Sequence, residues 1–460
     1  MRYALCVLLS AAAPLLAQDD QLKADATKAL KAAATHYHEQ VASHGGYVYY
    51  YSLDLKDRWG EGKASPDILF VQPPGTPTVG MAYLAAHAAT GDSFYLDAAR
   101  ETAECLVYGQ LQSGGWTQTI HYAKANRVGK YRNGKGGNWN VSSLDDDQTQ
   151  AALKFLIRAD ATLGFKNKEI HEAAEYGLAA LLKAQFASGG FPQVWTGPVP
   201  ELPAKKASFP TGDWKTEGKV KNYYDHPTLN DGLAGTVAEV LIVAHEVYKD
   251  DKYKAALAKL GDFLILAQMP DPQPGWCQQY TFDMVPMWAR KFEPPAVSGW
   301  ESQDAMNTLV RIARHTGEKK YLEPIPAALK YFAKHVSKDK TVPRFIEFGT
   351  DKPLYMDAAY QLTYDPTNAP THYGWTQPAR FDRIQKAHDA AKAGDPQPKE
   401  KAPTADEVRK VIATLDKDGR WVSEYANERL TGQPKFDRGF KYVSSDVFSK
   451  NVETLAGYIK

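Results

Sequence analysis

Hydrophobic residues recur at intervals of three and four along most of the chain, which is the period of an amphipathic helix. Each of several such runs ends in a short turn, and a second run then leads to glycine and an aromatic residue, as at Gly189-Gly190-Phe191. The pattern predicts antiparallel helix pairs that repeat roughly every 70 to 85 residues. The first helices of these pairs are expected near residues 80–90, 150–162, 236–248 and 305–316.

Helix pairs that each bury one face must stack on their neighbours. Long polar and aromatic loops fall between the second helix of one pair and the first helix of the next. These loops should therefore gather on one rim, which is where a functional site is expected. We expect an all-α fold, an (α/α) toroid or barrel of repeated antiparallel helix pairs, with an open helical array as the alternative.

Two segments interrupt the helical pattern. Residues 343–378 contain short alternating apolar runs and turn dipeptides, which predict a small irregular or β excursion. Residues 380–405 are polar and include a stretch rich in proline and lysine, which predicts a mobile connector. The remainder of residues 18–460 is expected to form a single toroidal catalytic domain.

The N-terminus has the pattern of a secretory signal peptide. Arg2 precedes an apolar run that ends at Leu16, and the small residue Ala17 follows. A signal peptide at residues 1–17 predicts a secreted or periplasmic protein; a buried N-terminal helix is the alternative. Cys105 and Cys277 remain in the mature chain, and the sequence leaves open whether they pair.

The charge balance directs attention to local patches. The chain of 460 residues has a formal net charge of +1, which gives no reason to expect nucleic acid as a partner, and no later stretch is apolar enough to span a membrane. Within residues 273–302, Trp276, Trp288 and Trp300 lie near Arg290. This segment is either a surface loop held by tryptophans or one wall of a site for an anionic sugar polymer.

Polar clusters recur where first helices begin, at residues 142–148, 226–232 and 298–304. Acidic residues at a helix start need no function, because they cap free N–H groups and suit the helix dipole. Three clusters at equivalent rim positions would nevertheless converge at the mouth of a toroid. Their carboxylates suit Ca²⁺ or Mg²⁺, or a glycosidase acid and base pair. Zinc is disfavoured, because His226 has no partner at a zinc-motif spacing.

Several motifs between roughly residues 114 and 378 resemble, in the same order, those of the pectic acid lyases of polysaccharide lyase family 10. They are residues 144–149 at a helix start, 189–193 at a turn, 224–231, 276–279 with 289–293 and 298–299, and 343–345 with 373–375. The chain departs from the family at Asp146 and Asp147, where Asn-Gly is usual, and at Trp288, where a second arginine is common.

The resemblance implies Ca²⁺-dependent cleavage of polygalacturonate by β-elimination, and we expect the protein to act as a monomer. Arg290 would be the base that removes the C5 proton. Asp145 is a second candidate catalytic residue, and Asp145 and Asp231 would hold Ca²⁺. Substrate would be bound by Arg344, Asn230, His226 and Trp288. Because free guanidine has a pKa above ~12, nearby cations and partial burial would have to lower that of Arg290, and we expect an alkaline optimum.

Two alternatives remain. A glycoside hydrolase on the same toroid would use Asp145 and Asp231 as its acid and base. A non-catalytic surface protein would bind the glycan and pass it on to a transporter.

Overall fold

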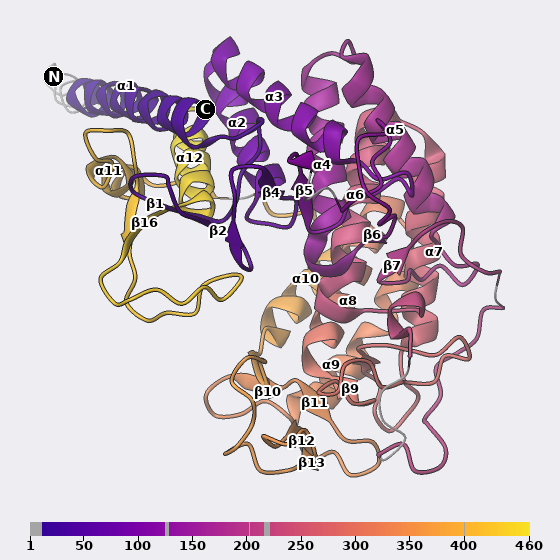
Figure 1. Cartoon of the computed structure of the whole chain (residues 1–460). Helices are drawn as coiled ribbons and strands as arrows, with labels where there is room; N and C mark the ends of the chain where they lie inside the picture. The colour runs from indigo at the N-terminus through magenta and orange to yellow at the C-terminus, as the bar shows by residue number, and fades with distance from the viewer. Residues whose placement is uncertain (1–11, 125–127, 202, 216–220, 400) are drawn as a thin grey trace, which may run out of the picture.

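The computed structural model describes residues 12–124, 128–201, 203–215, 221–399 and 401–460 (Figure 1). Helices dominate this part of the chain, and they alternate between two layers. The inner helices are α2 (Thr76–Thr90), α4 (Gln148–Thr162), α6 (Leu233–Tyr248), α8 (Gly299–Thr316), α10 (Phe381–Ala393) and α12 (Ser445–Ile459). The others are α1 (Ala12–His36), α3 (Ser93–Gly109), α5 (Lys168–Lys183), α7 (Asp251–Ala267), α9 (Ile325–Ala333) and α11 (Ala405–Ala413).

The inner helices follow one another around a common space. α12 packs on α2, α2 on α4, α4 on α6, α6 on α8 and α8 on α10. All six contribute residues, or residues at their ends, to the lining of one cavity of about 1120 Å³. The antiparallel helix pairs and the helix-rich fold are therefore confirmed, and the arrangement is of the α/α type.

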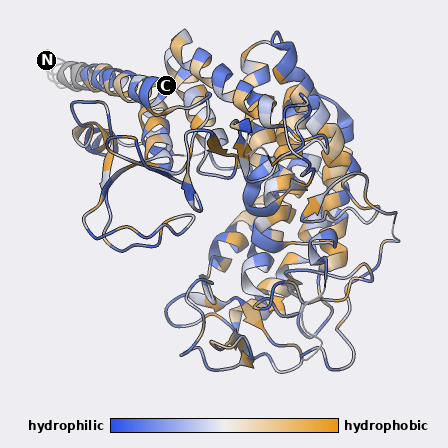
Figure 2. Cartoon of the chain, in the orientation of Figure 1, coloured by the Kyte–Doolittle hydropathy of each residue, from blue (hydrophilic) through white to orange (hydrophobic). Residues whose placement is uncertain are grey.

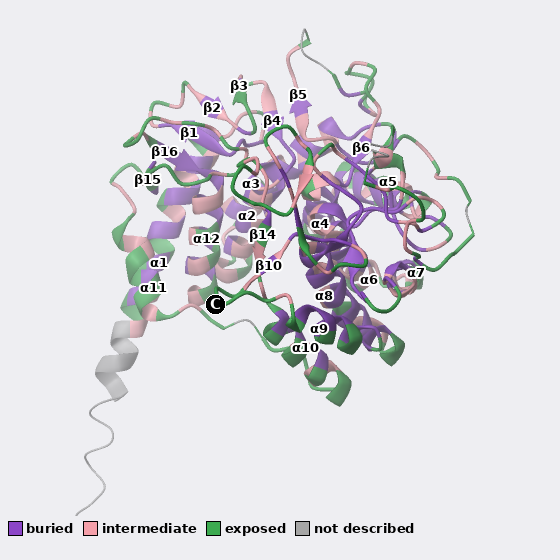
Figure 3. Ribbon diagram, turned by 90° about the horizontal axis from the view of Figure 1, so that it is seen from below, coloured by how far each residue is buried: buried purple, intermediate pink, exposed green. Residues whose placement is uncertain are grey.

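The ends of the helices explain why the pairs form. Gly91, with φ of 70°, ends α2, and Asp92 then caps α3 by accepting a hydrogen bond from the N–H of Phe94. Ser298 caps α8 in the same manner, and Gly317 ends it with φ of 82°. Glycine adopts this left-handed conformation without steric cost, so the positions of these short turns can be predicted from the sequence. Figure 2 shows hydrophobic and hydrophilic residues alternating around the helices, and Figure 3 shows α4 and α8 as largely buried.

The fold is not purely α-helical. One antiparallel sheet has the order β15 (Val422–Glu424), β16 (Lys441–Ser444), β1 (Tyr50–Ser52), β2 (Arg58–Trp59), β3 (Lys63–Ala64). It joins the two ends of the chain, with Tyr50 paired to Ser444. A second sheet has the order β13 (Leu362–Thr363), β12 (Pro353–Met356), β11 (Phe345–Ile346), β9 (Val297–Ser298), β8 (Trp276–Cys277). Strand pairs are β10 (Thr341–Pro343) with β14 (Thr376–Pro378), β4 (Ile68–Phe70) with β5 (Thr119–His121), and β6 (Ser142–Ser143) with β7 (Val194–Trp195).

These sheets confirm the expected excursion at residues 343–378 and correct the all-α expectation elsewhere. The sheet that joins the two ends of the chain, the terminal sheet, could not be recognised in the sequence, because its strands are two to four residues long. Strands this short show too little alternation to be recognised by period alone.

The expectation of a mobile connector at residues 380–405 is wrong for residues 381–393, which form α10. Phe381, Ile384 and His388 are buried on this helix, which packs against α8 and α9. Residues 1–11 of the expected signal peptide lie outside the described residues. Cys105 and Cys277 are buried free thiols, which answers the question of pairing. Among the described helices, none combines the length and apolar character needed to cross a bilayer.

Candidate active site

Two short 3-10 turns at the rim carry the predicted acidic residues. They are η3 (Asp145–Asp147), which precedes α4, and η5 (Asn230–Gly232), which precedes α6. Each residue of η5 stands 85 positions after its counterpart in η3, as position 230 does after 145. The backbone is left-handed at the last two residues of both turns, with φ of 47° at Asp146 and 52° at Asp231. Non-glycine residues adopt this conformation at a cost, and such strain is concentrated at functional sites.

The two turns bring three carboxylates together. Oxygen atoms of Asp145, Asp146 and Asp231 all lie within 4.8 Å of one another. Loss of water contact and the charge of Asp231 raise the pKa of Asp145 to about 6. The same effects, with the charges of Asp145 and Asp231, raise the pKa of Asp146 to about 7. The cluster thus concentrates negative charge at the rim.

Glutamine side chains from neighbouring loops support the two turns. Nε2 of Gln193 donates to Oδ1 of Asp145 at 2.6 Å. Gln278, which again stands 85 positions later, donates to Oδ1 of Asn230, and Asn230 in turn donates to Oδ2 of Asp231 at 2.7 Å. Sequence reasoning did not identify these glutamines as site residues. The signal was present, because each follows a glycine–aromatic turn by two positions.

Arg290 lies beside this cluster. Its Nη2 is 3.7 Å from Oδ2 of Asp231, and its guanidinium donates to both oxygens of the buried Glu293, from Nε at 2.8 Å and from Nη2 at 2.5 Å. Burial acts to lower the pKa of Arg290, as expected, but Glu293 and then Asp231 outweigh it, so the pKa is raised. Without substrate, Arg290 is therefore a charged guanidinium that is held in place by Glu293. Its ring neighbour is Phe292, at 5.1 Å from the ring centre.

Arg344, the residue immediately before β11, reaches the same cluster. Its Nη2 lies 3.1 Å from Oε1 of the fully buried Glu301 and 3.5 Å from Oδ1 of Asp231. Burial acts to lower the pKa of Arg344, but Glu301 and other anionic neighbours raise it. Arg344 thus stays charged, and its guanidinium lies 4.5 Å from the ring centre of Tyr373. The structure pairs Glu293 with Arg290 and Glu301 with Arg344.

The other two predicted substrate-binding residues make contacts of a different kind. His226 stacks on Phe282 with ring centres 4.1 Å apart, and burial lowers its pKa, so the ring is neutral near pH 7. Trp288 is buried and donates from Nε1 to the carbonyl of Trp214 at 2.7 Å. Its indole face is part of a hydrophobic cluster with Phe345 and Trp375, so it stabilises the loop of Arg290. The structure therefore brings together Asp145, Asn230, Asp231, Arg290 and Arg344, and adds Asp146, Gln193, Gln278 and Glu293.

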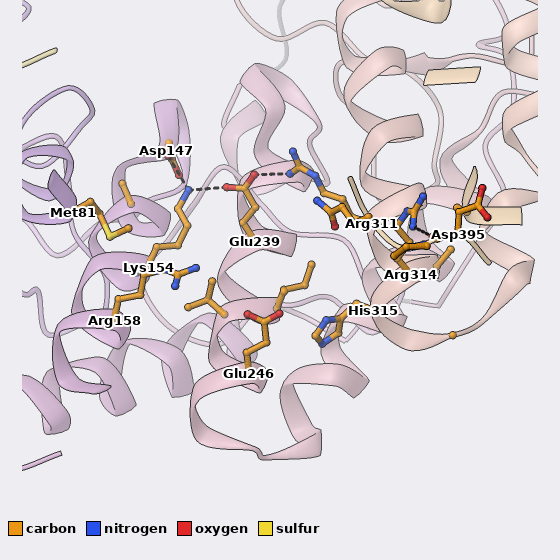
Figure 4. Close-up of a pocket in the computed structure, with 18 of the residues that line it drawn as sticks. Met81, Asp147, Lys154, Arg158, Glu239, Glu246, Arg311, Arg314, His315 and Asp395 are labelled. Carbon is orange, nitrogen blue, oxygen red and sulfur yellow. Dashed lines mark hydrogen bonds and ion pairs between the residues drawn. The ribbon is translucent and has the colours of Figure 1, made fainter. Parts of the chain in front are cut away.

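A chain of ion pairs runs from the rim into the cavity between the inner helices (Figure 4). Nζ of Lys154 lies 3.3 Å from Oδ2 of Asp147 and 3.0 Å from Oε2 of Glu239. Nη1 of Arg311 lies 2.5 Å from Oε1 of Glu239. The chain thus connects α4, α6 and α8, the helices whose starts form the candidate site.

The donor set fits a hard divalent cation. Three carboxylates offer oxygen atoms within one small region, which is the chemistry that Ca²⁺ prefers, and the described cluster includes no nitrogen or sulfur ligand. A bound cation would also offset the mutual repulsion that raises the pKa values of Asp145 and Asp146. Asp145, Asp146 and Asp231 are accordingly the residues that could hold Ca²⁺.

The chain is similar to one protein family and to several solved structures. A family model described as pectic acid lyase matches residues 110–364. Two structures of a family 10 polysaccharide lyase from Cellvibrio cellulosa, one of them a mutant in complex with a trigalacturonic acid, are 20% identical to the chain with a TM-score of 0.47. Each alignment covers 68% of this chain, together with 98% of the mutant's chain and 97% of the other lyase chain.

A cellobiose 2-epimerase from Spirochaeta thermophila is 14% identical, covers 96% of this chain and 97% of its own, and has a TM-score of 0.50, a likeness in fold alone. No curated protein matches the chain.

Proposed function

Because the chain belongs to the pectic acid lyase family, we propose that it cleaves polygalacturonate by calcium-dependent β-elimination, with Arg290 as the base. It is a polysaccharide lyase by family. The observation that carries the finer proposal is the meeting of Arg290 with Asp231, next to Asp145 and Asp146, from three separate loops. Guanidinium groups bind the carboxylates of an acidic sugar polymer, and clustered carboxylates bind a divalent ion; the site offers both.

Calcium held by Asp145, Asp146 and Asp231 would neutralise the uronate carboxylate and so make the neighbouring C5–H more acidic. Arg344 would hold a substrate carboxylate, since its charge is fixed at the edge of the cluster by Glu301. Asn230 would contribute through its hydrogen bond to Asp231, which sets the direction of that carboxylate. Trp288 and His226 would support the walls of the substrate groove.

Glu293 holds the guanidinium of Arg290 by its Nε and Nη2, which leaves Nη1 as the nitrogen free of that fork. We propose that neutral Arg290 accepts the C5 proton at Nη1. The raised pKa of Arg290 means that loss of its own proton must come first. We therefore expect the rate to increase toward alkaline pH.

Two further parts of the proposal concern the whole molecule. We propose that the six inner helices form a closed toroid, in which α10 and α12 complete the ring; the support is that both contribute to the lining of the central cavity. We also propose that the protein is exported after removal of residues 1–17 and acts as a monomer.

The test is incubation with polygalacturonate, followed by both ultraviolet absorbance and reducing-end release. Elimination leaves a conjugated double bond, so the proposal predicts absorbing product in step with new reducing ends. New reducing ends without absorbance would identify a hydrolase. Binding without either signal would identify a glycan-binding protein.

A further inference from the structure

The segment before residue 110 lies outside the family match, yet it reaches the candidate cation site. We propose that Gln72 is a positioning residue that holds Asp146 in place for calcium, as Gln193 holds Asp145. This inference rests on the proposed function, because it concerns the same cation. It assigns part of the site to a region that the family match does not include.

The amide of Gln72 is fully engaged. Its Nε2 donates to Oδ2 of Asp146 at 3.3 Å and to Oε1 of Glu61 at 3.0 Å. Its Oε1 accepts from Nε2 of Gln118 at 3.0 Å and from Nε2 of Gln148 at 3.5 Å. A primary amide has two donors and two acceptor positions, so this buried side chain has no freedom to turn.

The four partners of Gln72 come from three separate segments of the fold. Glu61 lies in the turn between β2 and β3, and Gln118 immediately precedes β5. Gln148 is the first residue of α4, and Asp146 is the centre of η3. Gln72 itself follows β4 and comes shortly before α2. One amide therefore fixes the rim of the terminal sheet against the turn that presents the carboxylates.

The same device occurs at the neighbouring loops. Gln193 donates to Asp145, and Gln278 donates both to Asn230 and, at 2.8 Å, to Glu293. Each glutamine thus holds a polar group of the site by an N–H of its amide. Among the described residues, Gln72 is the hydrogen-bond partner of the Asp146 carboxylate.

Loss of this contact should act on cation binding. Asp146 is the most exposed of the three aspartates, and Gln72 is its described hydrogen-bond partner, so the direction of its carboxylate depends on Gln72. Groups that orient metal ligands typically change affinity by about 10- to 100-fold when they are removed. Since Gln72 orients one ligand of three, we expect Gln72→Leu to weaken calcium binding about tenfold.

The experiment measures calcium affinity of the full chain by titration calorimetry, for the wild type, Gln72→Leu and a matched control, Gln273→Leu. Gln273 is equally buried, and its Nε2 donates to Tyr331, Glu347 and Asp351, away from the cluster. We expect about tenfold weaker binding for Gln72→Leu and unchanged binding for Gln273→Leu. The calcium concentration for half-maximal activity should increase to the same extent, and saturating calcium should restore turnover.

Equal calcium affinity in the wild type and Gln72→Leu would overturn the inference. So would an equal loss in both variants, because the effect would then follow from stability. If Gln72→Leu does not fold, Gln118→Leu removes a support of the same amide and should weaken calcium binding by less than the tenfold expected for Gln72→Leu. No change in calcium binding there would also overturn the inference. A wild type that binds no calcium would instead refute the calcium part of the proposed function, and the inference with it.

Discussion

Lys154 lies between two carboxylates below the rim, and its replacement by methionine should destabilise the protein through Asp147. Oδ1 of Asp147 is buried without a described hydrogen-bond partner, so the carboxylate depends on Lys154 at Oδ2. Burial raises the pKa of Asp147 to about 6 even though Lys154 acts to lower it. Asp147 also has a left-handed backbone, with φ of 61°, at the position where the second turn has Gly232. Asp147 is therefore unfavourable in both its backbone and its buried carboxylate, and its ion pair with Lys154 offsets this cost.

The loss of unfolding free energy in Lys154→Met can be estimated from the two carboxylates that lose their ion-pair partner. Removing one partner of a buried ion pair costs about 3–5 kcal/mol. The Lys154 side chain is 18% exposed, while Glu239 is 39% exposed and keeps Arg311, so we expect the lower end, about 3 kcal/mol. Asp147→Gly alone should be nearly neutral, because relief of ~1 kcal/mol of backbone strain offsets a similar glycine entropy cost. The double variant should then lose only about 1 kcal/mol, a coupling of about 2 kcal/mol.

The assay is reversible urea unfolding near neutral pH, followed by tryptophan fluorescence, for the wild type, both single variants and the double variant. The four free energies of unfolding form a cycle in which the coupling is measured directly. Losses that add to within about 0.5 kcal/mol would show that Lys154 does not act through Asp147.

Three further predictions concern single residues. Arg290→Lys keeps a cation beside Glu293 but removes the second donor of the fork, so turnover should fall by about 10²-fold or more while the melting temperature changes little. The hydrogen bond that Nδ1 of His171 donates to Asp160 raises the pKa of His171. The contribution of this bond to stability is therefore complete below about pH 6.5 and is lost as pH increases through the raised pKa. His171→Gln should cost more stability at pH 5.5 than at pH 9, and equal losses would contradict this. Burial raises the pKa of Asp304 to about 7, so the folded protein loses stability as pH increases from about 4 to about 7. Asp304→Asn should therefore stabilise the protein more at pH 8 than at pH 4, as measured by the unfolding midpoint; the reverse order would refute the assignment.

Much of the fold could be predicted because its rules are local. The helix pairs follow from period, and the short turns follow from residues such as Gly91 and Asp92, whose left-handed and capping roles need no tertiary information. The terminal sheet could not be predicted, because the pairing of Tyr50 with Ser444 joins residues at opposite ends of the chain. Helix α10 was missed because only Phe381, Ile384 and His388 mark its buried face within a polar sequence.

For the site, the sequence identified residue types but not their partners. Acidic helix starts and an aromatic-flanked arginine mark Asp145, Asp231 and Arg290 in the sequence, and the resemblance to the pectic acid lyases assigns their roles. Asp146 belongs to the same polar cluster and departs from the family pattern, but nothing local shows that its carboxylate lies with those of Asp145 and Asp231. The pKa of Arg290 could not be foreseen, since it depends on which of two nearby glutamates the loop brings to it.

In the proposed site, one divalent cation and Arg290 act together where the rim turns meet. The most direct measurement is the rate at which unsaturated product forms from polygalacturonate while free calcium is lowered with a chelator. We expect the ultraviolet signal to disappear as calcium is removed and to return when calcium is added back. Undiminished formation of unsaturated product at negligible free divalent cation would contradict the account.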